Sequence, residues 1–248
     1  MNNKTITDEL SPSERIIIAL DFETLEKAKE TIEQLGGKIG AFKIGKQLFT
    51  KEGAEAVKYI YSQGGKVFLD LKYHDIPNTV SSAGIVAAET GVFMFNIHCS
   101  GGYIMMKECA EKVKQYCTEK GIPKPLIIGV TVLTSIDSKI LKEELKITMP
   151  LEEYTIHLAI LAKKAGLDGV VCSPLEAKKI KEACGNEFLT VTPGIRPAWS
   201  SAGDQKRITT PKEALENSSD YIVIGRAVTS QQNKLEALQK ILEEIGEK

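Results

Sequence analysis

Short apolar runs separated by amphipathic segments most constrain the fold of this 248-residue chain. The runs are rich in Val, Ile and Phe, and each is short enough to form a strand buried on both faces. Eight of them follow one another, over residues 16–20, 41–44, 67–69, 92–97, 126–133, 169–172, 188–191 and 221–224. Eight strand–helix units in about 250 residues predict an α/β protein, a single-domain (β/α)8 TIM barrel. We place this barrel domain at residues 15–248, after a polar N-terminal extension over residues 1–14.

The segments between the runs carry helix patterns with recognisable ends. Thr24 is a candidate N-cap for a helix that stops at Gly36, and residues 151–164 predict a further helix. Residues 173–176 and 210–213 each predict a capping box with proline at the first helical position. The alternative fold is a doubly wound open sheet, which normally carries a glycine-rich phosphate turn after its first strand. The first run here ends Ala-Leu-Asp-Phe-Glu without glycine, which favours the barrel.

Charge and cysteine content exclude several classes of protein. The 32 basic and 33 acidic residues give a net charge of −1, which argues against a nucleic-acid or membrane-surface partner. The five cysteines form no C-x-x-C pair, which indicates reduced thiols. No apolar stretch suggests a signal peptide, and none approaches the roughly 20 residues of a membrane span. We therefore expect a cytoplasmic protein.

One stretch concentrates charge where the third predicted strand ends, Asp70-Leu71-Lys72-Tyr73-His74-Asp75. Strand alternation places Asp70 and Lys72 on one face, roughly 7 Å apart at about 3.3 Å per residue. Two carboxylates around an ammonium group are a poor way to stabilise a core, because burying charges usually costs more than pairing them returns. The structural alternative is a surface ion-pair cluster, and the motif taken alone favours neither interpretation.

Polar residues also end other runs, and a barrel enzyme has its active site at these carboxyl ends. They include Asp21, Lys43, Asn96, His98, Thr131, Thr134, Thr192 and the pair Gly225-Arg226. Because Lys43 and the Asp70/Lys72 pair come from neighbouring strands, we expect their charged groups to lie within a few ångströms. The loops after the seventh and eighth strands often bind phosphate, which suggests this role for Arg196 and Arg226. The alternative is that both arginines are solvated surface residues.

Taken together, these positions resemble the orotidine 5′-monophosphate decarboxylase family. The resemblance extends in order from Asp21 to Arg226 and rests on Lys43, Asp70-x-Lys72-x-x-Asp75-Ile76-x-Asn78-Thr79, Pro193-Gly194-Ile195-Arg196, Gln205 and Gly225-Arg226. The D-x-K-x-x-D motif alone is shared with a wider superfamily of sugar-phosphate barrels. Its combination with Lys43 and Ile-x-Asn-Thr is much more specific.

The resemblance implies decarboxylation of orotidine 5′-monophosphate (OMP) to UMP in pyrimidine biosynthesis, without metal or organic cofactor. It implies that Lys72 protonates C6 of the pyrimidine, within a charge array of Lys43, Asp70, Lys72 and Asp75. It also implies a homodimer in which Asp75 and Thr79 reach the partner's site. The other implied substrate contacts are Asp21 and Lys43 at the ribose, Thr134 at the pyrimidine, Ile76 beside Asp75, Gln205, Gly225 and Arg226 at the phosphate, and Arg196 in a lid above it.

The chemistry of such a reaction fits these residues. The electron pair left at C6 lies in the ring plane with no π system to delocalise it, so the protein must supply electrostatics and a proton. Two alternatives stay open. A related Mg²⁺-dependent sugar-phosphate enzyme is expected to carry an acidic ligand where this chain has Lys43, and a non-catalytic barrel would only bind a nucleotide or phosphosugar. His98 is either a site residue or structural, and Trp199 either covers the ligand or anchors its loop.

Overall fold

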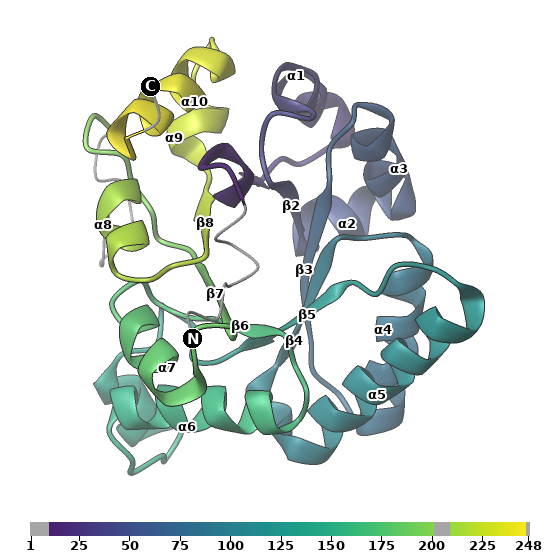
Figure 1. Ribbon diagram of the computed structural model, residues 1–248, viewed down its shortest axis with the longest axis vertical. Coiled ribbons are helices and arrows are strands. Elements are labelled where there is room, and N and C mark those ends of the chain that lie inside the picture. The colour runs from purple at the N-terminus through teal and green to yellow at the C-terminus, as the bar shows by residue number, and fades with distance from the viewer. Residues whose placement is uncertain (1–9, 201–208, 247–248) are drawn as a thin grey trace, which may run out of the picture.

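The computed structural model describes residues 10–200 and 209–246 and contains a closed parallel barrel (Figure 1). Eight strands pair in sequence order, and β8 pairs with β1 to close the barrel, which confirms the predicted (β/α)8 fold. The strands are β1 (Ile16–Leu20), β2 (Ala41–Gly45), β3 (Val67–Tyr73), β4 (Met94–His98), β5 (Leu126–Val130), β6 (Gly169–Val171), β7 (Leu189–Thr192) and β8 (Tyr221–Ile224).

Helices surround the strands on the outside of the barrel (Figure 1). They are α1 (Leu25–Leu35), α2 (Lys46–Glu52), α3 (Ala54–Ser62), α4 (Pro77–Glu89), α5 (Gly102–Lys120), α6 (Leu151–Lys164), α7 (Ala177–Cys184), α8 (Pro211–Glu216), α9 (Arg226–Thr229) and α10 (Lys234–Glu244). Short 3-10 helices span Ser13–Arg15 and Cys99–Gly101, and a π-helix spans Ile140–Glu144. None of the helices in the described ranges combines the length and apolarity needed to cross a bilayer.

The predicted helix ends are largely confirmed. Thr24 accepts a hydrogen bond from the Lys27 backbone, and Thr210 forms a full capping box with Glu213. The capping box predicted at Ser173 is wrong in one respect. Glu176 does accept a hydrogen bond from the Ser173 backbone at 2.9 Å, but residues 174–176 form a turn and the helix begins only at Ala177.

Alternation along the strands builds two apolar layers and the barrel mouth. On β1, Ile16, Ile18 and Leu20 face the helices, whereas Ile17 and Ala19 belong to a separate cluster inside the barrel. That inner cluster also contains Ala41, Phe68, Met94, Ile128, Leu189, Val191, Tyr221 and Val223. Because inward positions recur every second residue, the same rows continue to Asp21, Lys43, Asp70 and Asn96 at the carboxyl ends of their strands.

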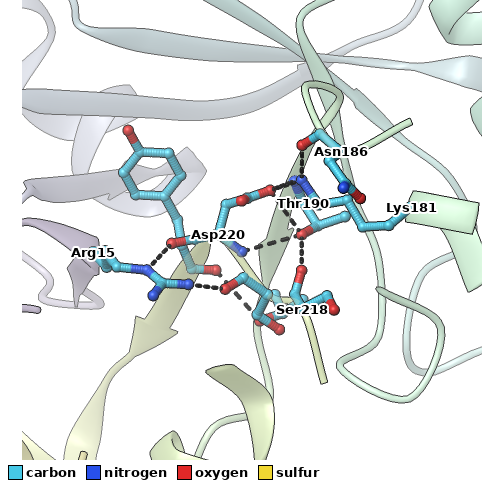
Figure 2. Close-up of polar contacts among 9 residues, drawn as sticks. Arg15, Lys181, Asn186, Thr190, Ser218 and Asp220 are labelled. Atoms are coloured by element: carbon cyan, nitrogen blue, oxygen red, sulfur yellow. Dashed lines mark hydrogen bonds and ion pairs between the residues drawn. The ribbon is translucent and has the colours of Figure 1, made fainter. Parts of the chain in front are cut away.

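The opposite end of the barrel is closed by a buried polar network (Figure 2). Lys181 Nζ lies 2.5 Å from Asp220 Oδ2, and Thr190 donates to that oxygen from its backbone N–H at 2.7 Å. Arg15, just before β1, donates to the Asp220 and Ser219 carbonyls at 3.0 and 2.6 Å. These contacts fasten the amino ends of β7, β8 and β1 together, and we expect them to act on stability rather than catalysis.

Candidate active site

A cavity of about 300 Å³ opens at the carboxyl ends of the strands. Its lining contains eight of the predicted site residues, namely Asp21, Lys43, Asp70, Lys72, Thr134, Arg196, Gly225 and Arg226. They come from the ends of β1, β2, β3, β5, β7 and β8, so the barrel order brings distant parts of the sequence to one mouth. Position 205, where we predicted a phosphate-binding glutamine, lies outside the described residues.

The remaining three predicted residues lie outside this lining in the single chain. Asp75, Ile76 and Thr79 follow β3 at the start of α4, and all three are exposed. Ile76 is 66% exposed, which is unusual for a large apolar side chain. These positions lie only a few residues beyond Lys72, at the rim of the barrel.

The centre of the site is a carboxylate held between two ammonium groups. Asp70 Oδ2 lies 3.1 Å from Lys43 Nζ, and Asp70 Oδ1 lies 2.5 Å from Lys72 Nζ. Asp21 approaches Lys43 from the first strand at 3.6 Å. The charged groups therefore meet within a few ångströms, as predicted from neighbouring strand ends.

The electrostatics of this centre favour an ionised Asp70. Burial opposes the charged form, but attraction by Lys43 and Lys72 and hydrogen bonds from Lys72 and Asn96 outweigh it and lower the pKa of the Asp70 carboxyl. The carboxylate then holds both lysine head groups at the cavity wall.

Asn96 is a site residue whose role the sequence did not reveal. This fully buried side chain donates from Nδ2 to Asp70 Oδ1 at 2.7 Å and accepts from the Lys72 backbone N–H at 2.8 Å. Lys72 has φ of 54°, in the left-handed region that non-glycine residues seldom adopt. The β3–β4 register shifts between Leu69 and Tyr73, at the same place. Asn96 thus supports a strained backbone that turns the Lys72 side chain toward Asp70.

The segment after β7 forms another part of the cavity wall. Gly194 has φ of 83° and turns the chain, and Ile195 pairs in a single bridge with Thr209. The Arg196 backbone N–H donates to the Thr209 carbonyl at 3.0 Å, and its side chain is largely buried at the cavity. Gly225 and Arg226, at the end of β8, line the same cavity. Two arginines and a glycine backbone can together bind a phosphate group.

The histidines at the mouth have a different character. The rings of His98 and His74 lie 5.2 Å apart, and His98 is outside the cavity lining. Burial, followed by the neighbouring His74 and Lys72, lowers the pKa of His98 to about 4, so it is neutral at neutral pH. Within residues 10–200 and 209–246, no cluster of three or more His, Cys, Asp or Glu side chains could hold a metal ion.

The fold and the site together define a barrel enzyme whose lysine and carboxylate side chains are arranged for acid–base chemistry at the mouth. The chain belongs to the orotidine 5′-phosphate decarboxylase / HUMPS family, whose profile matches residues 14–241.

Two curated relatives, both named orotidine 5′-phosphate decarboxylase, support this membership. The protein of Syntrophomonas wolfei is 48% identical over 96% of this chain and 100% of its own length. That of Geotalea daltonii is 49% identical over 93% of this chain and 95% of its own. The crystal structure of orotidine 5′-phosphate decarboxylase from Lactobacillus acidophilus superposes with a TM-score of 0.82 at 38% identity, covering 93% of this chain and 98% of the other.

Proposed function

We propose that this chain is a carboxy-lyase that converts OMP to UMP and carbon dioxide. The observation that carries the proposal is the Lys43–Asp70–Lys72 array, set in the wall of a cavity that also contains Arg196 and Arg226. Family membership and the names of the relatives support the same reaction.

In the proposed mechanism, the bond between C6 and the substrate carboxylate breaks and leaves its electron pair on C6. The Lys72 ammonium stabilises this charge and then transfers a proton from Nζ to C6, so no electrons are gained or lost overall. Asp70 holds Lys72 in place and also repels the substrate carboxylate. Lys43 keeps the Asp70 charge in position through its 3.1 Å ion pair.

Binding is divided between the two ends of the nucleotide. Asp21 and Lys43 bind the ribose, and Thr134 binds the pyrimidine. Arg196, Gly225, Arg226 and Gln205 bind the phosphate, with Arg196 in a lid above it. Because the phosphate lies far from C6, its binding energy serves to assemble the charged site.

We further propose that a homodimer completes each site, with Asp75 and Thr79 supplied by the second subunit and Ile76 beside them. Their exposure just beyond Lys72 supports this role. Further exposed apolar side chains on α4 and α5, Val86, Tyr103 and Ile104, would be covered by a second copy. We place the enzyme in the cytoplasm, with residues 15–248 as the catalytic domain and residues 1–14 as an N-terminal extension.

The proposed activity is tested by following the ultraviolet spectrum of OMP with purified protein and a chelator. Lys72→Ala should abolish turnover while the far-ultraviolet circular dichroism stays unchanged. Lys51→Ala removes an exposed lysine of α2 and serves as the control that should retain turnover. Turnover by Lys72→Ala at the wild-type rate would reject the proton-donor role, and activity lost on chelation would favour the Mg²⁺-dependent alternative.

The shared site has a separate test. Lys72→Ala and Asp75→Ala homodimers should each be inactive, whereas their mixture should regain activity after subunit exchange. A hybrid dimer contains one site in which both residues are intact. If exchange is verified and no activity returns, Asp75 does not act across the interface.

A further inference from the structure

The C-terminal helix α10 contacts the segment that carries Arg196. The Ala198 backbone N–H, two residues beyond Arg196, donates to Glu244 Oε2 at 3.2 Å. Lys240, one turn earlier on the same helix, places its ammonium 5.8 Å from the centre of the Trp199 ring. Helix α10 therefore contacts two consecutive residues of this segment, which favours the anchoring role for Trp199 over a role in covering the ligand.

Helix α10 is itself firmly attached to the barrel. Its N-cap Asn233 accepts from the Glu236 backbone at 3.0 Å, and the Lys234 backbone donates to Gln34 of α1 at 3.0 Å. The Lys234 side chain is almost fully buried, and its ammonium group pairs with Glu30 of α1 at 3.2 Å. The apolar face of α10, formed by Ala237, Leu238 and Ile241, is buried in the core, so α10 lies against α1 as a fixed support (Figure 1).

Glu244 is an unusual residue for the end of a helix. Its Oε1 atom is buried, and no hydrogen-bond donor among the described residues reaches it. Burial raises the pKa of this carboxyl, the Ala198 N–H opposes that effect, and nearby Glu213 adds to it. A half-buried carboxylate with one unpaired oxygen also lies unfavourably at the negative end of the helix dipole. Glu244 is therefore poorly explained as a purely stabilising residue.

We propose that Glu244 is a positioning residue for Arg196. Thr209 holds the Arg196 backbone on one side, and Glu244 holds the chain two residues further on. With both ends of this short stretch fixed, the Arg196 side chain is directed into the cavity. The inference rests on the proposed function, in which Arg196 contacts the substrate phosphate.

The test compares Glu244→Ala with the isosteric Glu244→Gln and with Glu243→Ala, which removes the neighbouring exposed carboxylate. Loss of one hydrogen bond to a charged group should lower kcat/KM for OMP by about tenfold in Glu244→Ala, mainly through KM. Glutamine still accepts from the Ala198 N–H and should restore kcat/KM to within about threefold of wild type, and Glu243→Ala should match wild type. The nucleoside orotidine, which lacks the phosphate, should show no change with any variant.

Two further measurements test whether Glu244 affects substrate binding through Arg196. In an Arg196→Ala background, adding Glu244→Ala should change kcat/KM for OMP by less than about twofold, because the two residues act in series. Additive losses, or equal losses for OMP and orotidine, would overturn the inference. Calorimetric binding of UMP gives a readout without turnover, and unchanged UMP affinity in Glu244→Ala would also overturn it. An inactive wild-type enzyme whose UMP affinity still falls with Glu244→Ala would instead reject only the proposed function.

Discussion

Replacing Lys181 with methionine should reveal how strongly the amino-terminal rim of the barrel stabilises the fold. Less than a tenth of the Lys181 and Asp220 side chains is exposed, and their charged atoms lie 2.5 Å apart (Figure 2). Methionine keeps most of the aliphatic volume but leaves the Asp220 carboxylate buried without this ammonium partner. The Thr190 backbone and hydroxyl still donate to Asp220 Oδ2, at 2.7 and 3.1 Å.

The expected loss in the free energy of unfolding follows from these contacts. Removing one partner of a buried ion pair costs about 3–5 kcal/mol, because the other charge stays buried. The two hydrogen bonds from Thr190 remain, so we expect the lower end, about 3 kcal/mol. For a chain of this size, each kcal/mol lowers Tm by about 2–4 °C, which gives a fall of about 6–12 °C.

Thermal unfolding followed by circular dichroism provides the assay. Lys179→Met is the matched control, because Lys179 lies on the same helix as Lys181 but pairs with Glu152 of α6 in an ion pair whose side chains are both about half exposed. Loss of this exposed pair should cost less than about 1 kcal/mol. Adding Asp220→Asn to Lys181→Met should recover part of the loss, since the buried negative charge that Lys181 neutralised is then also removed. Equal Tm values for Lys181→Met and Lys179→Met, or a change in kcat at a temperature where both are folded, would refute the reasoning.

Three other expectations concern the catalytic rim. Asn96→Ala removes the acceptor of the Lys72 backbone N–H and one hydrogen-bond donor to Asp70. We expect kcat to fall by about 10–100-fold in the ultraviolet assay. An unchanged kcat would show that the position of Lys72 does not depend on Asn96. The pKa of His98 is lowered to about 4, so as the pH falls the unfolded chain binds a proton at this residue before the folded chain does. The stability of the fold should therefore fall as the pH drops from 6.5 toward 4. An NMR titration should find neutral His98 above about pH 5, and a midpoint near 6.5 would contradict this. The pKa of Asp70 lies below its usual 3.8, so its contribution to stability is present above that pH and is lost as the pH falls through the lowered pKa. In urea unfolding, the difference in stability between wild type and Asp70→Asn should therefore shrink as the pH falls from neutral into the acid range, and a difference that stays constant with pH would contradict this.

The strands were predictable wherever an apolar run and the backbone pairing of a strand cover the same residues. The predicted and observed strands differ at β3, which continues through Asp70 and Lys72 to Tyr73 because backbone pairing persists after the side chains become polar. They also differ at β5, where the strand ends at Val130 although the apolar run continues to Leu133. Val132 and Leu133 line the cavity, and Val132 also packs against the core, so this part of the apolar run continues into the wall of the site.

Much of the candidate site was predictable because side chains alternate between the two faces of a strand. Asp21, Lys43 and Asp70 each follow an inward apolar residue by two positions, so the alternation that builds the core also aims them at the mouth. The role of Asn96 depends on the register between β3 and β4 and on the left-handed backbone of Lys72, neither of which has a periodic signal. The Glu244–Ala198 contact joins positions 46 residues apart and is equally invisible to local patterns.

The two rims use buried charge in opposite ways. At the amino rim the Lys181 ammonium pairs with the Asp220 carboxylate, which also accepts hydrogen bonds from Thr190. At the carboxyl rim of one chain, Lys43 and Lys72 share the buried carboxylate of Asp70, and the Asp75 that we propose comes from the second subunit would add a further negative charge. Asp21 adds little to this balance, because it is 66% exposed and water screens its charge. In this alternating array the Lys72 ammonium stays at the cavity wall, where it would stabilise a carbanion that forms beside it.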